Sequence, residues 1–315
     1  MKLKRMKRTS AIGLGTLGLL AIVLLVPVSA SAASTCSGQN GKIAAGAGDG
    51  LALIGKGGGV RWLLTSSRSS SATFQPSFSC SGKAIVYVGD DETTCPPIEI
   101  VNPLTGKRRF FPYPTFRTTA FPTGGCGFAP SFLRDGRLLF GVRGPASKDG
   151  TYVADGDGRH RHRLFDRFVC ASTADARWFL EGCGRSLILL NRQGQRVRTI
   201  TPRPPRAHVH YLVANFSPDG RWIVYGRAID TAAGGSYDYS DVFVVRRDGT
   251  HRRRLTRGGH SFEPSFSPDG RWVAFVRGSE GFGRQIVALP LAHPGRARVL
   301  VKADSPLRNP AWGVG

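Results

Sequence analysis

The stretch "SFSPDGRWVAFVRG", Ser265–Gly278, reads as two short strands joined by a tight turn. In its Ser-Pro-Asp-Gly core, proline sets the backbone angle of the second turn position and aspartate suits the third, while glycine accepts the left-handed conformation that follows. The short apolar runs bounded by Gly, Pro and Asp are typical of buried strands. Nearly the same sequence occurs at Asn215–Arg227, "NFSPDGRWIVYGR", so the hairpin is part of a repeat.

The copies of this hairpin align on one position, which is aromatic in all but one of them. The aligned residues are Phe78, Phe132, Ser172, Phe216, Phe266 and Trp312. Each complete copy is followed by a second hairpin, for example "DVFVVRRDGTHRRRLT" at Asp241–Thr256. Four strands per repeat, with a period mostly in the forties, predict the blades of a β-propeller.

The number of strands predicts six blades. Five complete blades are expected at residues 74–111, 128–165, 168–201, 210–256 and 261–301. Three strands remain within residues 41–66 and one within 309–315. Pairing the C-terminal strand with these three makes a sixth blade and removes the open edge between the first and last blades. We therefore expect an all-β, six-bladed propeller of four-stranded blades, in one domain spanning 33–315.

This repeat resembles the WD40-like propeller repeats of the TolB family. Residues 215–227 and 263–277 match the pattern P-x-F-S-P-D-G-R-W-[IV]-x-[FY] closely, and residues 76–89 and 130–143 match it loosely. The resemblance extends over essentially the whole chain after its N-terminal segment. It implies the fold and favours an interaction role, although such repeats also occur as parts of hydrolases.

Residues 1–32 have the features of a secretory signal peptide. A basic start, "MKLKRMKR", precedes the apolar run "AIGLGTLGLLAIVLLVPV", and Ala30-Ser31-Ala32 offers a small-residue cleavage site. Retention of this segment as a membrane anchor is the alternative. Cleavage would remove five basic residues and no acidic ones, which lowers the formal net charge from +23 to +18. We expect a secreted or extracytoplasmic protein, in the periplasm or cell envelope.

The six cysteines suit an exported protein with three disulfides, and the sequence alone leaves fifteen pairings open. In a propeller, the loops between second and third strands share one face with the connections between blades. Cys95 and Cys126 fall on that face, as do Cys170 and Cys183, whereas Cys36 and Cys80 fall on the opposite face. We therefore predict the pairs Cys36–Cys80, Cys95–Cys126 and Cys170–Cys183.

Basic residues recur after the last turn of each complete blade, on the strand expected to be outermost. The groups are Lys107–Arg109, Arg159–Arg163, Arg196 with Arg198, His251–Arg254, and Arg296 with Arg298. A charged outer strand prevents edge-to-edge aggregation, which explains this belt structurally. The belt could alternatively bind an anionic envelope polymer or lipid. An arginine-rich genome is another source of the positive charge. Nucleic acid is not expected as a partner outside the cytosol.

The loops on the face of the blade-to-blade connections supply the candidate ligand- or partner-binding residues. These are Arg206, His208, His210, Arg227, Tyr237, Asp238, Tyr239, His260, Glu263 and Arg284. Ordinary loop polarity is the alternative explanation for this set. The pairs His160-x-His162 and His208-x-His210 lack further ligands at metal-binding spacing, and "ADGDG" at 154–158 lacks the later acidic ligands of a calcium loop. We expect no metal and no cofactor.

The sequence contains no nucleophile elbow, zinc-protease motif or phosphate-binding loop. We therefore expect a monomeric, non-catalytic propeller that binds an envelope protein or another envelope component through its loops. One alternative is a propeller enzyme, a hydrolase or lyase, that acts on a polysaccharide or small molecule in the central funnel. Another is electrostatic adhesion of the belt to anionic envelope polymer or lipid, with the membrane contacted only in that way or through an uncleaved signal segment.

Overall fold

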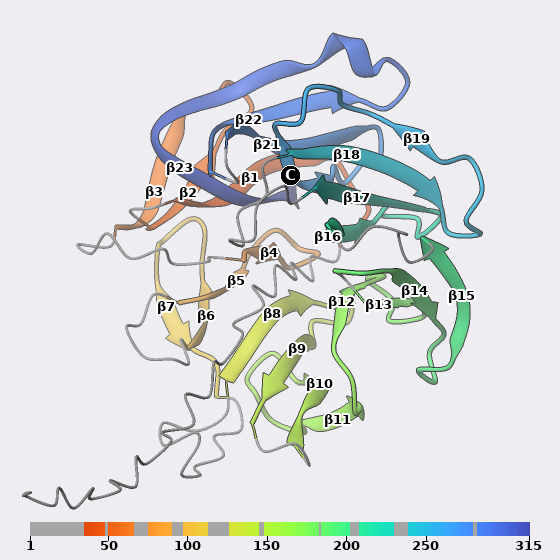
Figure 1. Ribbon diagram of the computed structural model, residues 1–315. Coiled ribbons are helices and arrows are strands. Elements are labelled where there is room, and N and C mark those ends of the chain that lie inside the picture. The colour runs from red at the N-terminus through yellow and green to blue at the C-terminus, as the bar shows by residue number, and fades with distance from the viewer. Residues whose placement is uncertain are drawn as a thin grey trace, which may run out of the picture.

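The computed structural model describes most of the chain after the N-terminal segment: residues 35–47, 50–65, 75–89, 97–112, 126–144, 148–182, 184–201, 208–229, 239–279 and 282–315. These residues form antiparallel sheets arranged in a propeller-like ring (Figure 1). The fold is therefore all-β, as expected. Over the same residues, no helix is long and apolar enough to cross a membrane.

Four of the sheets are four-stranded and follow the chain in sequence order. They consist of β4 (Ser77–Phe78), β5 (Ile85–Val88), β6 (Ile98–Val101) and β7 (Arg108–Phe110); β8 (Cys126–Phe132), β9 (Leu138–Arg143), β10 (Gly150–Ala154) and β11 (His162–Phe165); β12 (Val169–Ser172), β13 (Phe179–Glu181), β14 (Leu187–Leu190) and β15 (Arg196–Thr201); and β16 (Val209–Phe216), β17 (Trp222–Ile229), β18 (Tyr239–Arg246) and β19 (Arg253–Arg254). In Figure 1, β4, β8 and β16 lie toward the centre of the ring, and β7, β11, β15 and β19 toward its outside.

The remaining strands form a single seven-stranded sheet that contains both ends of the described chain. Its order is β20 (Ser261–Phe266), β21 (Trp272–Ser279), β22 (Phe282–Pro290), β23 (Arg298–Val314), β1 (Asn40–Ala47), β2 (Gly50–Ile54) and β3 (Val60–Thr65). A short 3-10 helix, Pro294–Arg296, precedes β23. The N-terminal strand β1 pairs with the C-terminal half of β23, from Ala47 opposite Leu307 to Asn40 opposite Val314.

This sheet differs from the expectation of separate four-stranded sheets. A distinct C-terminal strand was expected after residue 309, but the chain remains extended from Arg298 onward and no turn divides it. The first part of β23 pairs with β22, for instance Val301 with Ile286, and the last part pairs with β1. Because one strand pairs with both neighbours, the two sets of strands are hydrogen-bonded into one sheet.

The Ser-Pro-Asp-Gly turns have the conformation that the sequence predicts. Ser217 and Ser267 each donate a hydrogen bond from Oγ to the aspartate two positions later, at 2.5 Å. The same oxygens accept the main-chain N–H groups of Trp222 and Trp272, at 2.9 Å, where the next strand begins. The serine thus links the two ends of the turn and sets the register of the hairpin.

The fourth position of the turn is left-handed in every copy that the structure describes, and it follows an aspartate in all of them except the first, where Ser81 precedes Gly82. The φ angles are +69° at Gly82, +85° at Gly136, +67° at Gly220, +70° at Gly270 and +53° at Ala176. Ala176 is the one residue of the five that is not glycine, and alanine adopts this conformation only with strain. The third repeat therefore departs from the sequence pattern but keeps the geometry of the turn.

The innermost strands share a bulge that the sequence pattern does not reveal. A non-glycine residue with positive φ lies three positions before the aligned aromatic residue in four strands: Ala129, Val213, Glu263 and Asn309. At each of them the register of the strand shifts. A bulge leaves an N–H group without its ladder partner. The Gln75 Oε1 atom accepts that of Ala129 at 3.1 Å, and the Glu263 Oε2 atom accepts that of Asn309 at 2.6 Å.

The hydrophobic core lies between neighbouring sheets. Phe132 and Phe140 of the β8–β11 sheet pack with Val86 and Ile100 of the β4–β7 sheet in one buried cluster. The β16–β19 sheet packs against the seven-stranded sheet in the same way, and Phe275 of that interface is fully buried. Burial of both faces explains why the strands read as continuous apolar runs.

Most of the basic belt lies on β7, β11, β15 and β19 or in the turns just before them, whereas Arg298 lies on β23 within the seven-stranded sheet. Part of the belt joins neighbouring sheets. Arg109 donates to the Gly156 carbonyl oxygen at 2.6 Å, and Arg252 donates to that of Ile200 at 2.8 Å. Arg253 reaches the Leu291 carbonyl oxygen at 3.3 Å. Side chains of one sheet therefore satisfy main-chain carbonyls of the next, which gives these arginines a structural role.

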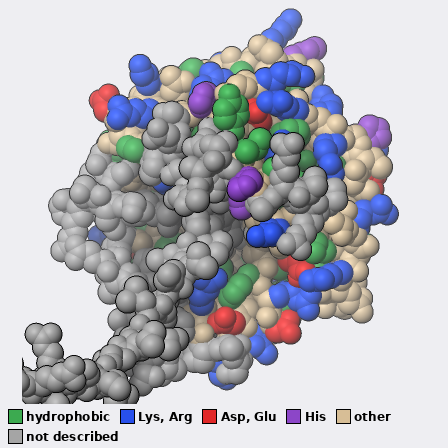
Figure 2. Space-filling model, in the orientation of Figure 1, with side chains coloured by type: hydrophobic (Ala, Val, Ile, Leu, Met, Phe, Trp, Pro, Cys, Tyr) green, Lys and Arg blue, Asp and Glu red, His purple; other side chains and the backbone are tan. Residues whose placement is uncertain are grey.

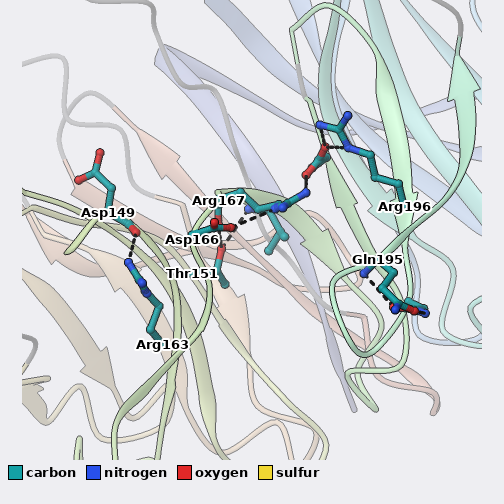
Figure 3. A network of polar contacts seen from close by, with 10 residues as sticks. Asp149, Thr151, Arg163, Asp166, Arg167, Gln195 and Arg196 are labelled. Atoms are coloured by element: carbon teal, nitrogen blue, oxygen red, sulfur yellow. Dashed lines mark hydrogen bonds and ion pairs between the residues drawn. The ribbon is translucent and has the colours of Figure 1, made fainter. Parts of the chain in front are cut away.

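A polar network joins the β8–β11 and β12–β15 sheets (Figure 3). The buried Glu181 carboxylate binds Arg196 at 2.6 Å and Arg167 at 3.3 Å, measured between nitrogen and oxygen. Arg167 lies in the connection between the sheets, where its carbonyl oxygen accepts the Thr151 hydroxyl at 2.8 Å. The Thr151 oxygen accepts the Val169 N–H in turn, at 3.1 Å. One buried carboxylate thus anchors the connection and the outer strand together.

One predicted disulfide is confirmed: Cys36 is bonded to Cys80, with Cα atoms 5.2 Å apart. It ties the segment before β1 to the turn after β4. Cys170 is also disulfide-bonded, and its predicted partner Cys183 lies outside the described residues. For the predicted Cys95–Cys126 pair, Cys95 and the side chain of Cys126 lie outside them as well.

The strained alanine provides a stability test. Ala176→Gly is expected to raise the free energy of unfolding by about 0.5–1 kcal/mol, because glycine adopts positive φ without strain. Gly270→Ala is the matched control. An added Cβ there contacts only Pro218, at 3.7 Å, so the φ of +70° alone should lower the stability by a similar amount. Urea unfolding measures both, and a shift of the two variants in the same direction would contradict this account.

The Cys36–Cys80 disulfide should contribute about 2–4 kcal/mol to stability by restricting the unfolded chain. The double variant Cys36→Ser/Cys80→Ser is therefore expected to unfold at lower urea concentration than the oxidised wild type. Peptide mapping of the unreduced wild type should also recover linked peptides for Cys95–Cys126 and Cys170–Cys183. A Cys95–Cys170 peptide would show that the pairing argument is wrong.

Candidate functional site

The candidate site lies on the loop face, defined here as the side of the ring where each sheet connects to the next. His208, His210, Arg227 and Tyr239 lie at the corresponding ends of β16, β17 and β18. The other described candidates belong to the neighbouring strands of the seven-stranded sheet: His260, Glu263 and Arg284. Arg206, Tyr237 and Asp238 lie outside the described residues.

Tyr239 and His260 are brought together across the two sheets. Their ring centroids are 6.1 Å apart, and Tyr239 remains 49% exposed. The chain is held close by a hydrogen bond of 2.8 Å from the Ser240 N–H to the Gly259 carbonyl oxygen. Gly259 has a φ of +79°, and a Cβ atom there would lie 2.1 Å from the Tyr239 ring. Glycine is therefore required for this aromatic pair to form.

Other predicted members of the site are kept apart. His210 pairs with Ala228, whereas Arg227 pairs with Tyr211 and Asp241. Adjacent positions on a strand point to opposite faces of the sheet, so His210 and Arg227 lie on different faces. Arg284 is exposed on β22. The seven candidates that the structure describes therefore do not form a single cluster.

Glu263 lies on the innermost strand β20, at the bulge. Its carboxylate accepts the Asn309 N–H, which connects β20 to the C-terminal half of β23. Burial raises the pKa of Glu263 above its ordinary value, because a charged carboxylate is disfavoured away from water. The hydrogen bond and the nearby Arg308 oppose this shift. These contacts indicate a structural role for Glu263 in joining inner strands.

A groove of about 560 Å³ runs between the β16–β19 sheet and the seven-stranded sheet. One wall is the chain that follows β19, from Arg254 to His260, and the other includes Phe275 and Arg277 of β21. Pro294, Gly295 and Ala297 line its far end. We call this the interblade groove.

The interblade groove carries positive charge that no carboxylate of the described residues neutralises. Arg254 is paired with the buried Asp241, which also accepts the Thr256 hydroxyl at 2.9 Å. Arg257 is exposed and Arg277 is half-buried, and neither forms an ion pair with a carboxylate of the described residues. Arg277 lies over the Phe275 ring, 5.6 Å from its centroid. The groove can therefore bind an anionic group.

Of the residues that line this groove, sequence analysis selected His260 as a binding candidate and placed Arg254 in the basic belt. Arg257 and Arg277 begin two loops of the loop face, "RGGHSFE" and "RGSEGFGR", but neither was among the binding candidates. A signal was present in "RRRLTRGGHSFE", Arg252–Glu263, where Arg257 stands apart from the outer-strand arginines and next to two glycines. Arg257 and Arg277 line the same groove only because two sheets pack together, and no local sequence pattern encodes that packing.

Figure 2 shows lysine and arginine side chains spread around the outer rim of one face, with acidic side chains between some of them. Within the belt, Asp155 binds His160 at 2.6 Å, and this hydrogen bond raises the pKa of His160. Across the residues described, no group of three or more His, Cys, Asp or Glu side chains is placed to hold a metal ion.

No protein-family model and no curated protein sequence matches the chain. Solved structures do. TolB from Acinetobacter baumannii superposes with a TM-score of 0.62 at 21% identity, over 87% of this chain and 67% of that one. A putative TolB from Agrobacterium tumefaciens gives 0.58 at 15% identity, over 87% and 94%. The fold is that of a TolB-like β-propeller.

The same fold is shared with an enzyme. An oligogalacturonate lyase in complex with manganese superposes on the TolB-like propeller with a TM-score of 0.52 at 13% identity, over 86% of this chain and 77% of that one. At these identities the comparisons establish the fold and leave activity to be argued from the site.

The raised pKa of Glu263 gives a test of its structural role. In the unfolded chain Glu263 ionises near its ordinary value, whereas in the folded chain it keeps its proton to higher pH. Between the pKa of Glu263 in the unfolded chain and its higher pKa in the folded chain, the folded state binds more protons. Stability therefore falls as pH rises through this window. Glu263→Gln retains an oxygen for the Asn309 N–H and removes the titration. Its stability should exceed that of the wild type above the window.

Urea unfolding from about pH 4 to about pH 8 measures this difference, since the window lies above the ordinary glutamate pKa. Glu181→Gln is the control with the opposite sign. The Glu181 carboxylate is neutralised by two arginines, so its loss should lower the stability at neutral pH. A Glu263→Gln variant that is destabilised at every pH would contradict the assignment.

Proposed function

We propose that this chain is an extracytoplasmic, non-catalytic propeller of six four-stranded blades that binds a protein of the cell envelope through its loop face. The sixth blade follows from dividing the seven-stranded sheet within β23. Residues 298–302 would complete the blade of β20–β22, and residues 307–314 the blade of β1–β3. The register gives the boundary: residues 298–302 pair with β22 and residues 308–314 with β1, whereas Leu307 between them pairs with Gly283 of β22 and also with Ala47 of β1.

Two features support a location outside the cytosol. Disulfides such as Cys36–Cys80 persist in oxidising compartments and are rare in reducing ones. Residues 1–32 have the basic and apolar regions of a signal peptide, with cleavage after Ala32. The propeller domain would then comprise residues 33–315, and we expect it to be monomeric.

The observation that carries the binding proposal is the arrangement on the loop face at Tyr239, His260 and the interblade groove. The exposed Tyr239 ring packs beside Gly259, where only glycine leaves room for it. Arginines that have no acidic partner among the described residues lie nearby in the groove. Aromatic and arginine side chains dominate the energetics of protein interfaces, because they bury large areas and form several hydrogen bonds. The likeness to TolB is consistent with an envelope-binding role.

The likeness to an oligogalacturonate lyase, together with a cationic groove, supports an alternative in which the propeller acts on an acidic saccharide. A third possibility is adhesion of the basic belt to anionic envelope polymer or lipid. The three differ in what they require: a discrete partner, turnover of a substrate, or charge alone.

A pull-down from envelope extract, with the mature oxidised chain as bait, separates these functions. We expect one protein to be retained at both low and high salt, and to be lost with the double variant Tyr239→Ala/His260→Ala. The matched control Arg198→Gln removes a charge from β15 on the belt and should retain it.

Capture of polymer or lipid that washes off with salt would assign the function to the belt instead, provided that Arg198→Gln weakens the capture as much as Tyr239→Ala/His260→Ala does. Turnover of oligogalacturonate into an unsaturated product by the isolated protein would replace the binding proposal with the enzymatic one.

A further inference from the structure

We propose that the interblade groove binds an extended acidic peptide segment of a protein partner, with carboxylates at alternate positions. This inference rests on the proposed function and specifies the chemistry of the partner at one part of the loop face. It follows from the charge of the groove, from the main-chain segment that forms one wall, and from the burial of the apolar side chains in its lining.

The charge of the groove selects an anion. None of the residues that line it is Asp or Glu, and its basic side chains are Arg254, Arg257, His260 and Arg277. Asp241 already neutralises Arg254, so Arg257 and Arg277, on opposite walls, are the arginines of the groove without an acidic partner among the described residues. Arginine presents a planar fork of donors that matches a carboxylate and forms charge-assisted hydrogen bonds. Two separate arginines suit a ligand with two or more carboxylates.

The wall formed by residues 254–258 suits a peptide. Beyond Leu255 and Thr256, whose N–H groups donate to Val242, the N–H groups of Arg257 and Gly258 donate to no described residue. A Cβ atom on Gly258 would meet nothing within 4 Å, so the space beside it is open. An exposed main-chain segment of this kind can hydrogen-bond an extended peptide, as sheet edges do in peptide recognition.

The apolar surface of the groove favours a peptide over a saccharide. Phe275 and Leu289 line the groove but are fully buried, and Leu255 is only 6% exposed. The exposed aromatic ring in the lining is that of His260, which already packs with Tyr239, so the lining offers a sugar little aromatic surface to stack on. The groove offers main-chain hydrogen bonds and guanidinium groups, which match the main chain and the carboxylates of an acidic peptide.

Geometry also predicts the spacing of the acidic residues. In an extended peptide, residues two apart point to the same side. A peptide lying along residues 254–258 would direct every second side chain toward the opposite wall, where Arg277 lies. Because Arg257 also lines the groove, carboxylates at alternate positions would all enter the space that Arg257 and Arg277 share, whereas consecutive acidic residues would direct half of their charge away from it.

Fluorescence anisotropy tests this with the mature, oxidised chain and a short labelled peptide that has aspartate at every second position. We expect saturable binding that weakens as salt is added. The same peptide with asparagine in place of aspartate should bind at least about tenfold more weakly, as expected for the loss of charge-assisted hydrogen bonds.

Variants locate the site. Arg257→Gln and Arg277→Gln should each weaken binding of the aspartate peptide about tenfold, the equivalent of one charge-assisted hydrogen bond. Arg277→Lys keeps the charge without the fork and should fall between Arg277→Gln and the wild type. Arg198→Gln removes the same charge from the belt and should change the affinity by less than about twofold. Unfolding curves confirm that each variant is folded.

Several results would overturn the proposal. Equal affinity for the asparagine peptide, or equal loss with Arg198→Gln, would show that the groove is not the site. Tighter binding of oligogalacturonate or polyphosphate than of the peptide, with loss on Arg257→Gln, would assign the groove to a non-protein polyanion. If no peptide binds while the envelope protein is still captured through Tyr239 and His260, the occupant of the groove is wrong and the proposed function stands.

Discussion

The pairing of β23 with β1 is the interaction on which the other parts of the structure depend. It joins residue 314 to residue 40 in one antiparallel ladder and leaves neither end of the described chain as an exposed sheet edge. The Cys36–Cys80 disulfide adds a covalent tie between the segment before β1 and the neighbouring β4–β7 sheet. Because the core lies between sheets, each sheet depends on both neighbours for burial, and the joined ends help to keep all of them in place.

The hairpins were predictable because their determinants are local. In the two closest copies a serine oxygen, an aspartate and a left-handed glycine define the turn within a few residues, so the sequence between Ser267 and Trp272 is sufficient to identify it. The basic outer strands were predictable for the same reason, since their position follows from the count of strands after each turn. Ala176 shows the limit of this reasoning: the turn persists although its glycine is absent, because the surrounding hairpin imposes the conformation.

Features that depend on packing between sheets were not predictable from local patterns. The bulges at Val213 and Asn309 have no glycine to mark them, and the continuity of β23 is invisible in a segment that contains two prolines after residue 303. The candidate site was predicted in part: Tyr239 and His260 meet, whereas His210 and Arg227 face opposite ways. Arg257 and Arg277 are 20 residues apart in sequence, and only the packing of two sheets makes them neighbours of one groove.

The arginines of this protein differ in role according to what surrounds them. On the outer strand β7 and just before β19, Arg109 and Arg252 donate to main-chain carbonyls of an adjacent sheet, and Arg196 of β15 neutralises a buried glutamate. In the interblade groove, Arg257 and Arg277 have no such partner among the described residues. A large net positive charge therefore does not by itself indicate an anionic ligand. The arginines without a partner among the described residues are the ones that indicate where an anion can bind.

The position of β23 also has a consequence for the order of folding. Contacts between residues 40–47 and 307–314 span nearly the whole chain, so β1 cannot acquire its neighbour until the last residues are available. During synthesis or export the other hairpins can form from local contacts, while one edge of β1 remains open. Contacts of such long sequence separation are slow to form, and an open edge is prone to pair with other chains. The final residues therefore control when the molecule stops being vulnerable to aggregation.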